Sequence, residues 1–519
     1  MREQLALLPR YLTAHLQLSL AALALGLLIS LPIALWVLRR PRLEGPILGI
    51  ASVLQTIPGL ALLALMVPAL AYLSTFTAER LGFETSSIGF LPALIALTLY
   101  SILPILRNTV TGISNLDPAL IEAARGVGMT PAQRTRLVEI PLALPVMVAG
   151  IRTATVWVVG TATLATPVGA TSLGNYIFTG LQTRNFTAVA VGSAAAAALA
   201  LTLDGLIRLL EVSLQRRSRR LAVFSLTALA ALAIYATGAA LAPVLRGPTQ
   251  RPIVIGAKSF TEQYILAEAI ALRIEQATGR ATRSLPSLGS TVAFDALRTG
   301  HLDLYVDYSG TVWATIMKRQ DLPNDRSAVT AAVAEYLLEE HDIHTLGSLG
   351  FENTYALGMR RSQAEELGIR TISDLALHAG NLAIGGDFEF FARTEWKALN
   401  ERYGLPFREQ RAMDSSLMYQ AVASGGVDVI SAYSTDGRIA ALDLILLEDD
   451  LGVIPPYDAI IVAGSRLAET EPEVLAALDP LLGAIDEELM QALNWAVDEE
   501  GRLPRDVAAE LLERLLERH

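Results

Sequence analysis

Long apolar runs separated by short polar stretches fill the first half of this 519-residue chain. A helix needs roughly 20 consecutive, mostly apolar residues to span a bilayer. Six runs reach that length, at about 12–38, 46–73, 87–106, 142–165, 186–211 and 221–244. The pattern therefore predicts an all-α transmembrane bundle of about six helices in this half.

The second half has a different periodicity, in which short apolar runs alternate with amphipathic helical patterns. The candidate strands are 253–256, 302–306, 382–385, 427–430 and 459–462. Ser259 and Thr261 precede an apolar periodic stretch and predict a capped helix start. Such alternation is typical of an α/β fold with a largely parallel sheet. About 270 residues exceed what one such lobe needs, so we expect two lobes with a cleft between them.

The arginines of the first half predict its orientation. Up to Gln250 the chain has 18 Arg, no Lys and 9 acidic residues, and most of the Arg lie in the loops after the first, third and fifth runs. Short cytoplasmic loops are enriched in Lys and Arg, whereas the two opposite loops carry only Arg80 and Arg184. The N-terminus and everything after the sixth run are therefore predicted to lie outside the cytoplasm. A cleaved signal peptide is the competing interpretation of the first run, but no small-residue cleavage site follows it before Arg39.

Composition narrows the function classes. The first half has a formal charge of +9 and residues 251–519 have −20, which gives −11 for the chain. Cysteine is absent, which excludes a disulfide framework, a thiolate metal site and a cysteine nucleophile. The few His residues of the second half have no acid or nucleophile at motif spacing, which argues against an extracytoplasmic enzyme. The pair Asp449 and Asp450 has no further ligand at metal-site spacing.

The polar stretch 122–145 (EAARGVGMTPAQRTRLVEIPLALP) lies between two apolar runs. Gly128 and Pro131 predict a turn between two helical pieces, and Pro141 and Pro145 predict a helix-breaking exit. No G-x-x-x-x-G-K-[ST] phosphate loop occurs here or elsewhere in the sequence.

This stretch resembles the coupling loop of ABC importer permeases. The resemblance rests on the triplet Glu122, Ala123 and Ala124, on Gly128 and on Ile140-Pro141. It implies that Glu122, Ala123, Ala124 and Gly128 contact a separate cytoplasmic ATPase subunit. That subunit would bind the ATP and Mg, so no cofactor is expected in this chain.

The second half resembles the substrate-binding proteins of osmoprotectant importers, over nearly all of 252–510. The resemblance rests on the motifs at 258–263 (KSFTEQ), 300–311 (GHLDLYVDYSGT), 353–357 (NTYAL), 432–439 (AYSTDGRI), 447–450 (LEDD) and 455–457 (PPY). One segment departs from the family pattern. Residues 387–393 (DFEFFAR) are richer in aromatic residues than the usual Phe-x-x-Arg-x-Asp-Gly, which leaves open the choice of ligand within the betaine class.

The resemblance implies a box of aromatic rings around a quaternary ammonium. The matching positions are Tyr308 and Tyr457 on the first lobe and Tyr355 and Tyr433 on the second. Gln263 and Thr311 would hydrogen-bond the far end of the ligand. A trimethylammonium group has no N–H to donate and carries a diffuse positive charge, so the negative faces of aromatic rings solvate it well.

Together these patterns predict a type I ABC importer permease fused to a two-lobed, α/β periplasmic-binding-protein-like domain. The expected boundaries are a permease domain at 1–220, a sixth transmembrane helix and linker at 221–250, and an extracytoplasmic binding domain at 251–519. The first lobe would hold about 251–348 and 449–519, and the second about 349–448.

The predicted function is ATP-driven uptake of glycine betaine, choline, carnitine or a similar compatible solute across the cell membrane. The expected partners are the ATPase, a second copy of the chain, the small ligand and lipid, with no nucleic acid. An ergothioneine importer of the same architecture and a membrane-anchored ligand sensor are the alternatives. A sensor needs a cytoplasmic output domain, and the sequence offers none.

Overall fold

A computed structural model describes residues 2–81, 86–183, 185–245, 251–319, 325–387 and 390–516. The chain separates into two compact units, Met1–Phe178 with Thr187–Gln250, and Thr179–Phe186 with Arg251–His519. Arg184 and the linker residues 246–250, on which two of our expectations fall, lie outside the described residues. The two units are described in turn.

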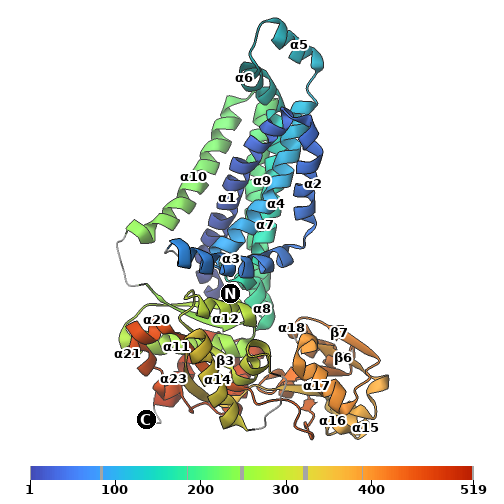
Figure 1. Cartoon of the computed structure of the whole chain (residues 1–519), viewed down its shortest axis with the longest axis vertical. Helices are drawn as coiled ribbons and strands as arrows, with labels where there is room; N and C mark the ends of the chain where they lie inside the picture. The colour runs from blue at the N-terminus through green and yellow to red at the C-terminus, as the bar shows by residue number, and fades with distance from the viewer. Residues whose placement is uncertain are drawn as a thin grey trace. The chain divides into compact units, whose positions relative to one another are not determined.

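The first unit is helical throughout (Figure 1). Its main helices are α1 (Arg2–Leu38), α2 (Glu44–Thr56), α3 (Gly59–Leu81), α4 (Phe90–Ser114), α5 (Pro118–Gly126), α6 (Pro131–Arg134), α7 (Ile140–Ala162), α8 (Gly174–Gln182), α9 (Phe186–Gln215) and α10 (Arg219–Leu245). Within the described ranges, five helical segments are long and apolar enough to cross a membrane, or six if one bent pair counts as a span. This helical permease region agrees with the predicted bundle.

The bent pair is the second expected span. Helices α2 and α3 meet at 98°, so the apolar run 46–73 is not one straight helix. Ile57 at the break has extended backbone angles (φ −67°, ψ 127°), and Pro58 follows it. Proline disfavours helical angles in the residue before it, which explains the position of the bend.

The polar loop contains the two helical pieces that the sequence predicted, α5 and α6. Gly128 between them has φ +82°, a left-handed conformation that glycine adopts without steric cost. The predicted helix-breaking exit is wrong. A wide π-helical turn, Thr135–Glu139, leads directly into α7, with Pro141 in the first turn and Pro145 inside the helix. The N–H of Ile140 closes the last wide turn onto Thr135, so the missing N–H of Pro141 falls at a helix start, where it is tolerated.

Glycines bring the central helices of this unit close together. A Cβ on Gly26 of α1 would lie 1.9 Å from Ser101 Oγ of α4, and one on Gly150 of α7 would lie 2.8 Å from the Pro104 carbonyl of α4. Small residues of this kind allow close helix packing in membranes. Helix α7 is also tied to α9 by charge, because Arg152 pairs with Asp204 at 3.2 Å and with Glu211 at 2.8 Å.

The second unit contains two five-stranded sheets. The first has the order β2 (Thr282–Leu288), β1 (Ile253–Lys258), β3 (Leu304–Tyr308), β10 (Asp458–Gly464) and β4 (Ile343–Glu352). The second has the order β7 (Glu409–Ala412), β6 (Ala383–Gly386), β8 (Val429–Tyr433), β5 (Tyr355–Arg360) and β9 (Leu444–Leu446). The unit is thus a two-sheet α/β domain of the kind predicted.

Helices lie between the strands in sequence. Those in the two chain segments that build the first sheet are α11 (Thr261–Thr278), α12 (Ser290–Arg298), α13 (Ser309–Thr311), α14 (Arg326–His341), α20 (Ser465–Thr470), α21 (Pro472–Ala476), α22 (Glu487–Asp498) and α23 (Pro504–Leu516). Those in the segment that builds the second sheet are α15 (Arg361–Leu367), α16 (Ile372–Ala376), α17 (Thr394–Tyr403), α18 (Ser415–Ala423) and α19 (Arg438–Ala441).

All five predicted strands are present, but the expectation of largely parallel sheets is wrong. Within each sheet two strand pairings are parallel and two are antiparallel. The chain leaves the first sheet after β4 and returns to it at β10, which runs antiparallel to both β3 and β4. The predicted cap at Ser259 is also wrong, because the N-cap of α11 is Phe260, whose side chain makes no capping hydrogen bond.

Candidate functional site

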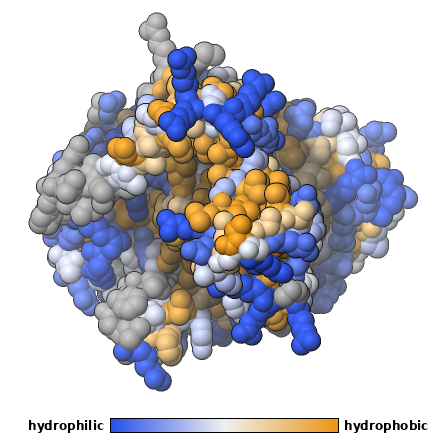
Figure 2. Space-filling model, turned by 90° about the horizontal axis from the view of Figure 1, so that it is seen from above, coloured by the Kyte–Doolittle hydropathy of each residue, from blue (hydrophilic) through white to orange (hydrophobic). Residues whose placement is uncertain are grey.

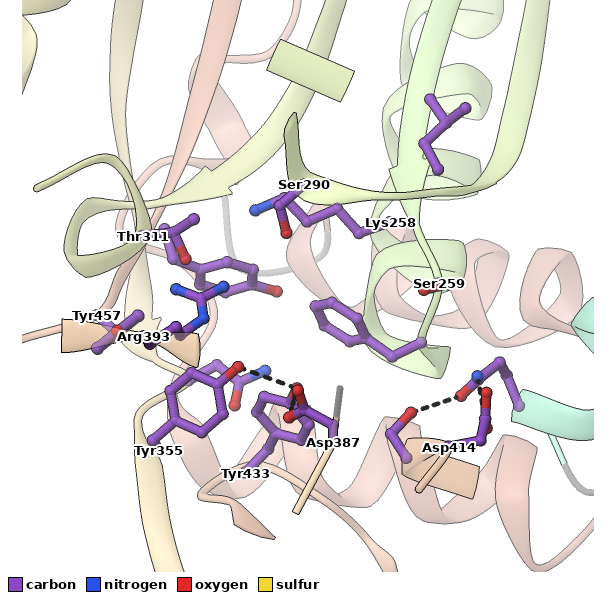
Figure 3. A pocket seen from close by; sticks show the side chains of 16 residues that line it. Lys258, Ser259, Ser290, Thr311, Tyr355, Asp387, Arg393, Asp414, Tyr433 and Tyr457 are labelled. Atoms are coloured by element: carbon purple, nitrogen blue, oxygen red, sulfur yellow. Dashed lines mark hydrogen bonds between the residues drawn. The ribbon is translucent and has the colours of Figure 1, made fainter. Parts of the chain in front are cut away.

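A pocket of about 190 Å³ in the second unit is lined by residues of both sheets. All four tyrosines expected in the aromatic box line it, as does Thr311, and Figure 3 shows several of these side chains directed into it. Pockets for drug-sized ligands usually measure roughly 300–1,000 Å³. The size therefore fits a small solute.

The sheets place the four tyrosines as two neighbouring pairs. Tyr308 ends β3, and Tyr457 directly precedes β10, the antiparallel neighbour of β3. Tyr355 begins β5 and lies opposite Tyr433, the last residue of β8, in the strand register. Each sheet thus contributes the pair that was expected of it, although the four positions are far apart in sequence.

The rings approach one another closely enough to form one aromatic surface. Ring centroids are 5.1 Å apart for Tyr355 and Tyr433, and 5.9 Å apart for Tyr355 and Tyr457, which meet at 84°. Phe260, which the sequence analysis did not single out, stacks on Tyr433 at 5.8 Å and also lines the pocket. Phe260 belongs to the KSFTEQ motif, which is the sequence signal that could have identified it.

Gln263 lies behind the pocket wall and is not among the lining residues. Its Nε2 donates to the Tyr308 hydroxyl at 3.0 Å, and its Oε1 accepts from the backbone N–H of Lys258 at 3.2 Å. In this structure Gln263 therefore fixes the Tyr308 ring and the end of β1 at Lys258.

Two cations line the pocket that sequence reasoning did not assign to it. Lys258 Nζ pairs with Asp307 at 2.5 Å and lies 5.2 Å from the centroid of the Tyr308 ring. The guanidinium carbon of Arg393 lies 5.2 Å from the centroid of the Tyr355 ring, and Figure 3 shows this side chain close to Thr311. Lys258 belongs to the KSFTEQ motif and Arg393 to the aromatic-rich segment 387–393. Both segments were noted in the sequence analysis, and they are the signals that could have identified these two residues.

Burial and nearby carboxylates keep the hydroxyls of Tyr308 and Tyr457 protonated. The pKa values of Tyr308 and Tyr457 are raised well above the usual range, first because both are buried and then because Glu262 and Glu395, respectively, lie beside them. The pKa of Glu262 is raised by burial, and hydrogen bonds from four uncharged groups oppose that rise. Tyr308 and Tyr457 therefore present neutral rings to a ligand at physiological pH.

The paired aspartates near the return to the first sheet have partners within the protein. Asp449 accepts hydrogen bonds from the Tyr403 hydroxyl and the Ile454 N–H, and Asp450 accepts one from the Ser373 N–H. Across the described ranges no group of three or more His or acidic residues could hold a metal ion. These contacts fit the structural role expected of the pair.

The coupling-loop residues occupy α5 and the turn after it. Glu122, Ala123 and Gly128 are exposed, whereas Ala124 is buried. The apolar side chain of Val127 is also exposed, to 75%. Seen from the end of the helical unit at which α5 lies in Figure 1, a hydrophobic patch is surrounded by hydrophilic side chains (Figure 2).

Comparison with known proteins assigns a family to each part of the chain. Residues 251–514 match the family described as the substrate binding domain of ABC-type glycine betaine transport systems. Residues 23–220 match the family described as the binding-protein-dependent transport system inner membrane component. The two matches fall on either side of the linker.

Curated relatives show the same division. The chain is 32% identical over 480 residues to an ergothioneine transport permease/ergothioneine binding protein of Helicobacter pylori, covering 90% of this chain and 83% of the relative. It is 41% identical over 197 residues to a choline transport system permease protein of Bacillus subtilis, covering 38% of this chain and 83% of the relative. Among solved structures, a glycine betaine/carnitine/choline ABC transporter protein matches with 33% identity and a TM-score of 0.44, over 50% of this chain and 98% of that one.

These matches cover both halves of the chain and agree with its apolar helices and two-sheet domain. A transporter of this kind is a membrane protein, and this chain matches its permease and substrate-binding components. The chain belongs to the ABC importers of the osmoprotectant and ergothioneine class, as a permease fused to its extracytoplasmic substrate-binding domain.

Proposed function

We propose that this chain takes up a zwitterionic quaternary-ammonium solute, which it binds in the tyrosine-lined pocket. The observation that carries the proposal is the composition of that pocket. Four tyrosine rings from two sheets share one small cavity with Lys258, Arg393 and Thr311. Aromatic faces and fixed cations in one cavity suit a ligand that has a cationic and an anionic end.

The trimethylammonium group would lie against Tyr308, Tyr355, Tyr433 and Tyr457. Each ring contributes about 0.5–2 kcal/mol to binding a cation, depending on how far water is excluded. Four rings thus supply about 2–8 kcal/mol, and the upper end of this range approaches the roughly 8 kcal/mol of micromolar affinity.

The carboxylate of the ligand would lie toward Lys258, Arg393 and Thr311. Ammonium, guanidinium and hydroxyl groups are donors that a carboxylate accepts, and charge-assisted hydrogen bonds are the stronger kind. Glycine betaine, carnitine and ergothioneine all have a carboxylate, whereas choline does not. The fused relative named for ergothioneine keeps that betaine among the candidates.

Calorimetry on the full chain in detergent tests the ligand class. We expect saturable binding of glycine betaine, carnitine or ergothioneine, weaker binding of choline, and none of proline or glutamate. The Tyr433→Ala variant should lose at least about tenfold in affinity, because it removes one ring face. Tyr403→Ala is the control, since Tyr403 is a buried tyrosine outside the pocket that also donates to a carboxylate. A folded chain that binds none of the betaines would refute the proposal.

We further propose that two copies of the chain work in the lipid bilayer with a separate ATPase, which binds the ATP and Mg and contacts α5. The exposure of Glu122, Ala123 and Val127 on this loop supports a docking role. A new charge at such an interface, Ala123→Glu, should abolish uptake of radiolabelled ligand in cells and leave calorimetric binding unchanged. Loss of both activities together would instead indicate misfolding, and normal uptake would refute the contact.

A further inference from the structure

Three of the four box tyrosines donate their hydroxyls to carboxylates. Tyr308 donates to Glu262 Oε1 at 2.5 Å, and Tyr433 donates to Asp387 Oδ2 at 2.9 Å (Figure 3). Tyr457 donates to Glu395 Oε1. We call Glu262, Asp387 and Glu395 the carboxylate shell.

The shell comes from separate parts of the fold and is buried. Glu262 lies in the first turn of α11, Asp387 directly follows β6, and Glu395 lies in the first turn of α17. Their relative exposures are 2%, 6% and 1%. Three acids at this depth are unusual, because acidic residues are almost never fully buried unless they have partners.

The hydrogen bonds around the shell favour its ionised form. Asn353 donates to Glu262 Oε1 at 3.0 Å, and Asn494 donates to Oε2 at 3.4 Å. An amide N–H donates and has no lone pair to accept a carboxyl proton. Phe390 likewise donates its backbone N–H to Asp387 Oδ1 at 2.8 Å.

Charge compensation differs along the shell. Arg393 Nη1 lies 3.7 Å from Glu395 Oε1, so part of the charge on Glu395 is balanced within the pocket wall. The four groups that donate to Glu262, from Tyr308, Asn353, Thr435 and Asn494, are all uncharged. Among the described residues, Glu262 thus accepts hydrogen bonds from uncharged groups, whereas Glu395 has a cation beside it.

We propose that the carboxylate shell acts through the tyrosines to select a cation over a neutral group of the same shape. A phenol that donates to a carboxylate gains electron density on its ring, which strengthens attraction at the ring face. The charge of the carboxylate also acts directly on a cation in the pocket, since Coulomb energy is large where water is excluded. Glu262 and Glu395 do not line the pocket and are positioning residues here, whereas Asp387 lines it.

This inference rests on the proposed betaine site, and one pair of ligands tests it. Glycine betaine and tert-butylacetate have the same shape and the same carboxylate, but tert-butylacetate has carbon in place of the charged nitrogen. Both are titrated calorimetrically into the full chain and into Glu262→Gln, Asp387→Asn and Glu395→Gln. The amide oxygen still accepts the tyrosine hydrogen bond, so these changes remove charge and keep shape.

We expect Glu262→Gln to weaken glycine betaine about tenfold and to leave tert-butylacetate unchanged or slightly tighter, with a smaller effect for Glu395→Gln. Asp387 lies at the pocket surface. The affinities of Asp387→Asn for the two ligands therefore test the inference if Glu262→Gln fails to fold. Asp498→Asn is the matched control, because Asp498 is buried in the same unit and accepts from Thr261, not from a tyrosine.

Equal weakening of both ligands in the folded variants would overturn the inference, because it would mean that the carboxylates only hold the rings in place. No change for either ligand would overturn it as well. In both cases the proposed function stands, since the wild-type chain still binds glycine betaine. Failure of the wild-type chain to bind any betaine is a separate result and refutes the proposed function itself.

Discussion

Asp498 illustrates how a single buried acid connects the chemistry of the binding domain to its stability. Burial raises its pKa to about 7, while Arg438 nearby and a hydrogen bond from Thr261 act in the opposite direction. In the unfolded chain an aspartate has a pKa of about 3.9. Between these two values the folded protein holds a proton that the unfolded chain has released.

The sign of the pH dependence follows from this difference. Stability falls with rising pH wherever the folded state binds more protons, so the domain should lose stability between about pH 4 and pH 7. Each unit of pKa difference corresponds to about 1.4 kcal/mol. We expect Asp498→Asn to flatten this decline and to raise the melting temperature at about pH 8 relative to wild type. Parallel melting curves for the two proteins between about pH 5 and pH 8 would contradict the assignment.

The short element α13 shows how a backbone position shapes the aromatic box. Gly310 directly follows Ser309 at the end of β3, and a Cβ there would lie 2.6 Å from the Tyr457 ring and 2.8 Å from the Pro456 carbonyl. No side chain can be added without moving the ring or the backbone beside it. Glycine in the DYSGT motif is thus required by the packing of the box.

Gly310→Ala should therefore weaken ligand binding and destabilise the domain by about 1–3 kcal/mol, the usual cost of overpacking. Calorimetric affinity and the melting temperature measure the two effects. Gly289→Ala is the control, because its nearest neighbour, Val292, is 3.8 Å from the added Cβ and its φ of −69° suits alanine. Wild-type affinity in Gly310→Ala would show that the ring position does not depend on this contact.

At the scale of the whole molecule, topology determines which surfaces meet the ATPase and which meet the ligand. The sequence has no cysteine, so a single introduced thiol reports its own location. Val127 and Leu377 are exposed to 75% and 84%, on the coupling loop and on the binding domain respectively. A membrane-impermeant maleimide added to intact cells should label Leu377→Cys and not Val127→Cys.

Permeabilised cells provide the control for this experiment, because there both thiols should react. Labelling of Val127→Cys in intact cells would place the coupling loop outside and would reverse the predicted orientation.

Several elements were predictable because they depend on local pattern. Apolar length alone indicated the membrane helices, and short apolar runs indicated β1, β3, β6, β8 and β10. The edge strand β7 was missed because its sequence, Glu409–Ala412, is polar and exposed. The break at Pro58 and the unbroken start of α7 at Pro141 were misjudged, because the effect of a proline depends on whether its missing N–H falls at the start of a helix or within it.

The sequence by itself determined the division into a membrane half and an acidic α/β half, and it predicted the orientation and the four tyrosines, since hydropathy, charge and motifs are properties of neighbouring residues. Only the tertiary structure decided that β10 returns antiparallel, that Lys258 and Arg393 share the pocket with the rings, and that three carboxylates lie behind them. Those relations join residues 46 to 62 positions apart for the hydrogen-bonded pairs Tyr308 with Glu262, Tyr433 with Asp387, and Tyr457 with Glu395. No local pattern encodes such pairings, because they are set by how strands and helices pack within each sheet and, for Tyr457 with Glu395, between the two sheets.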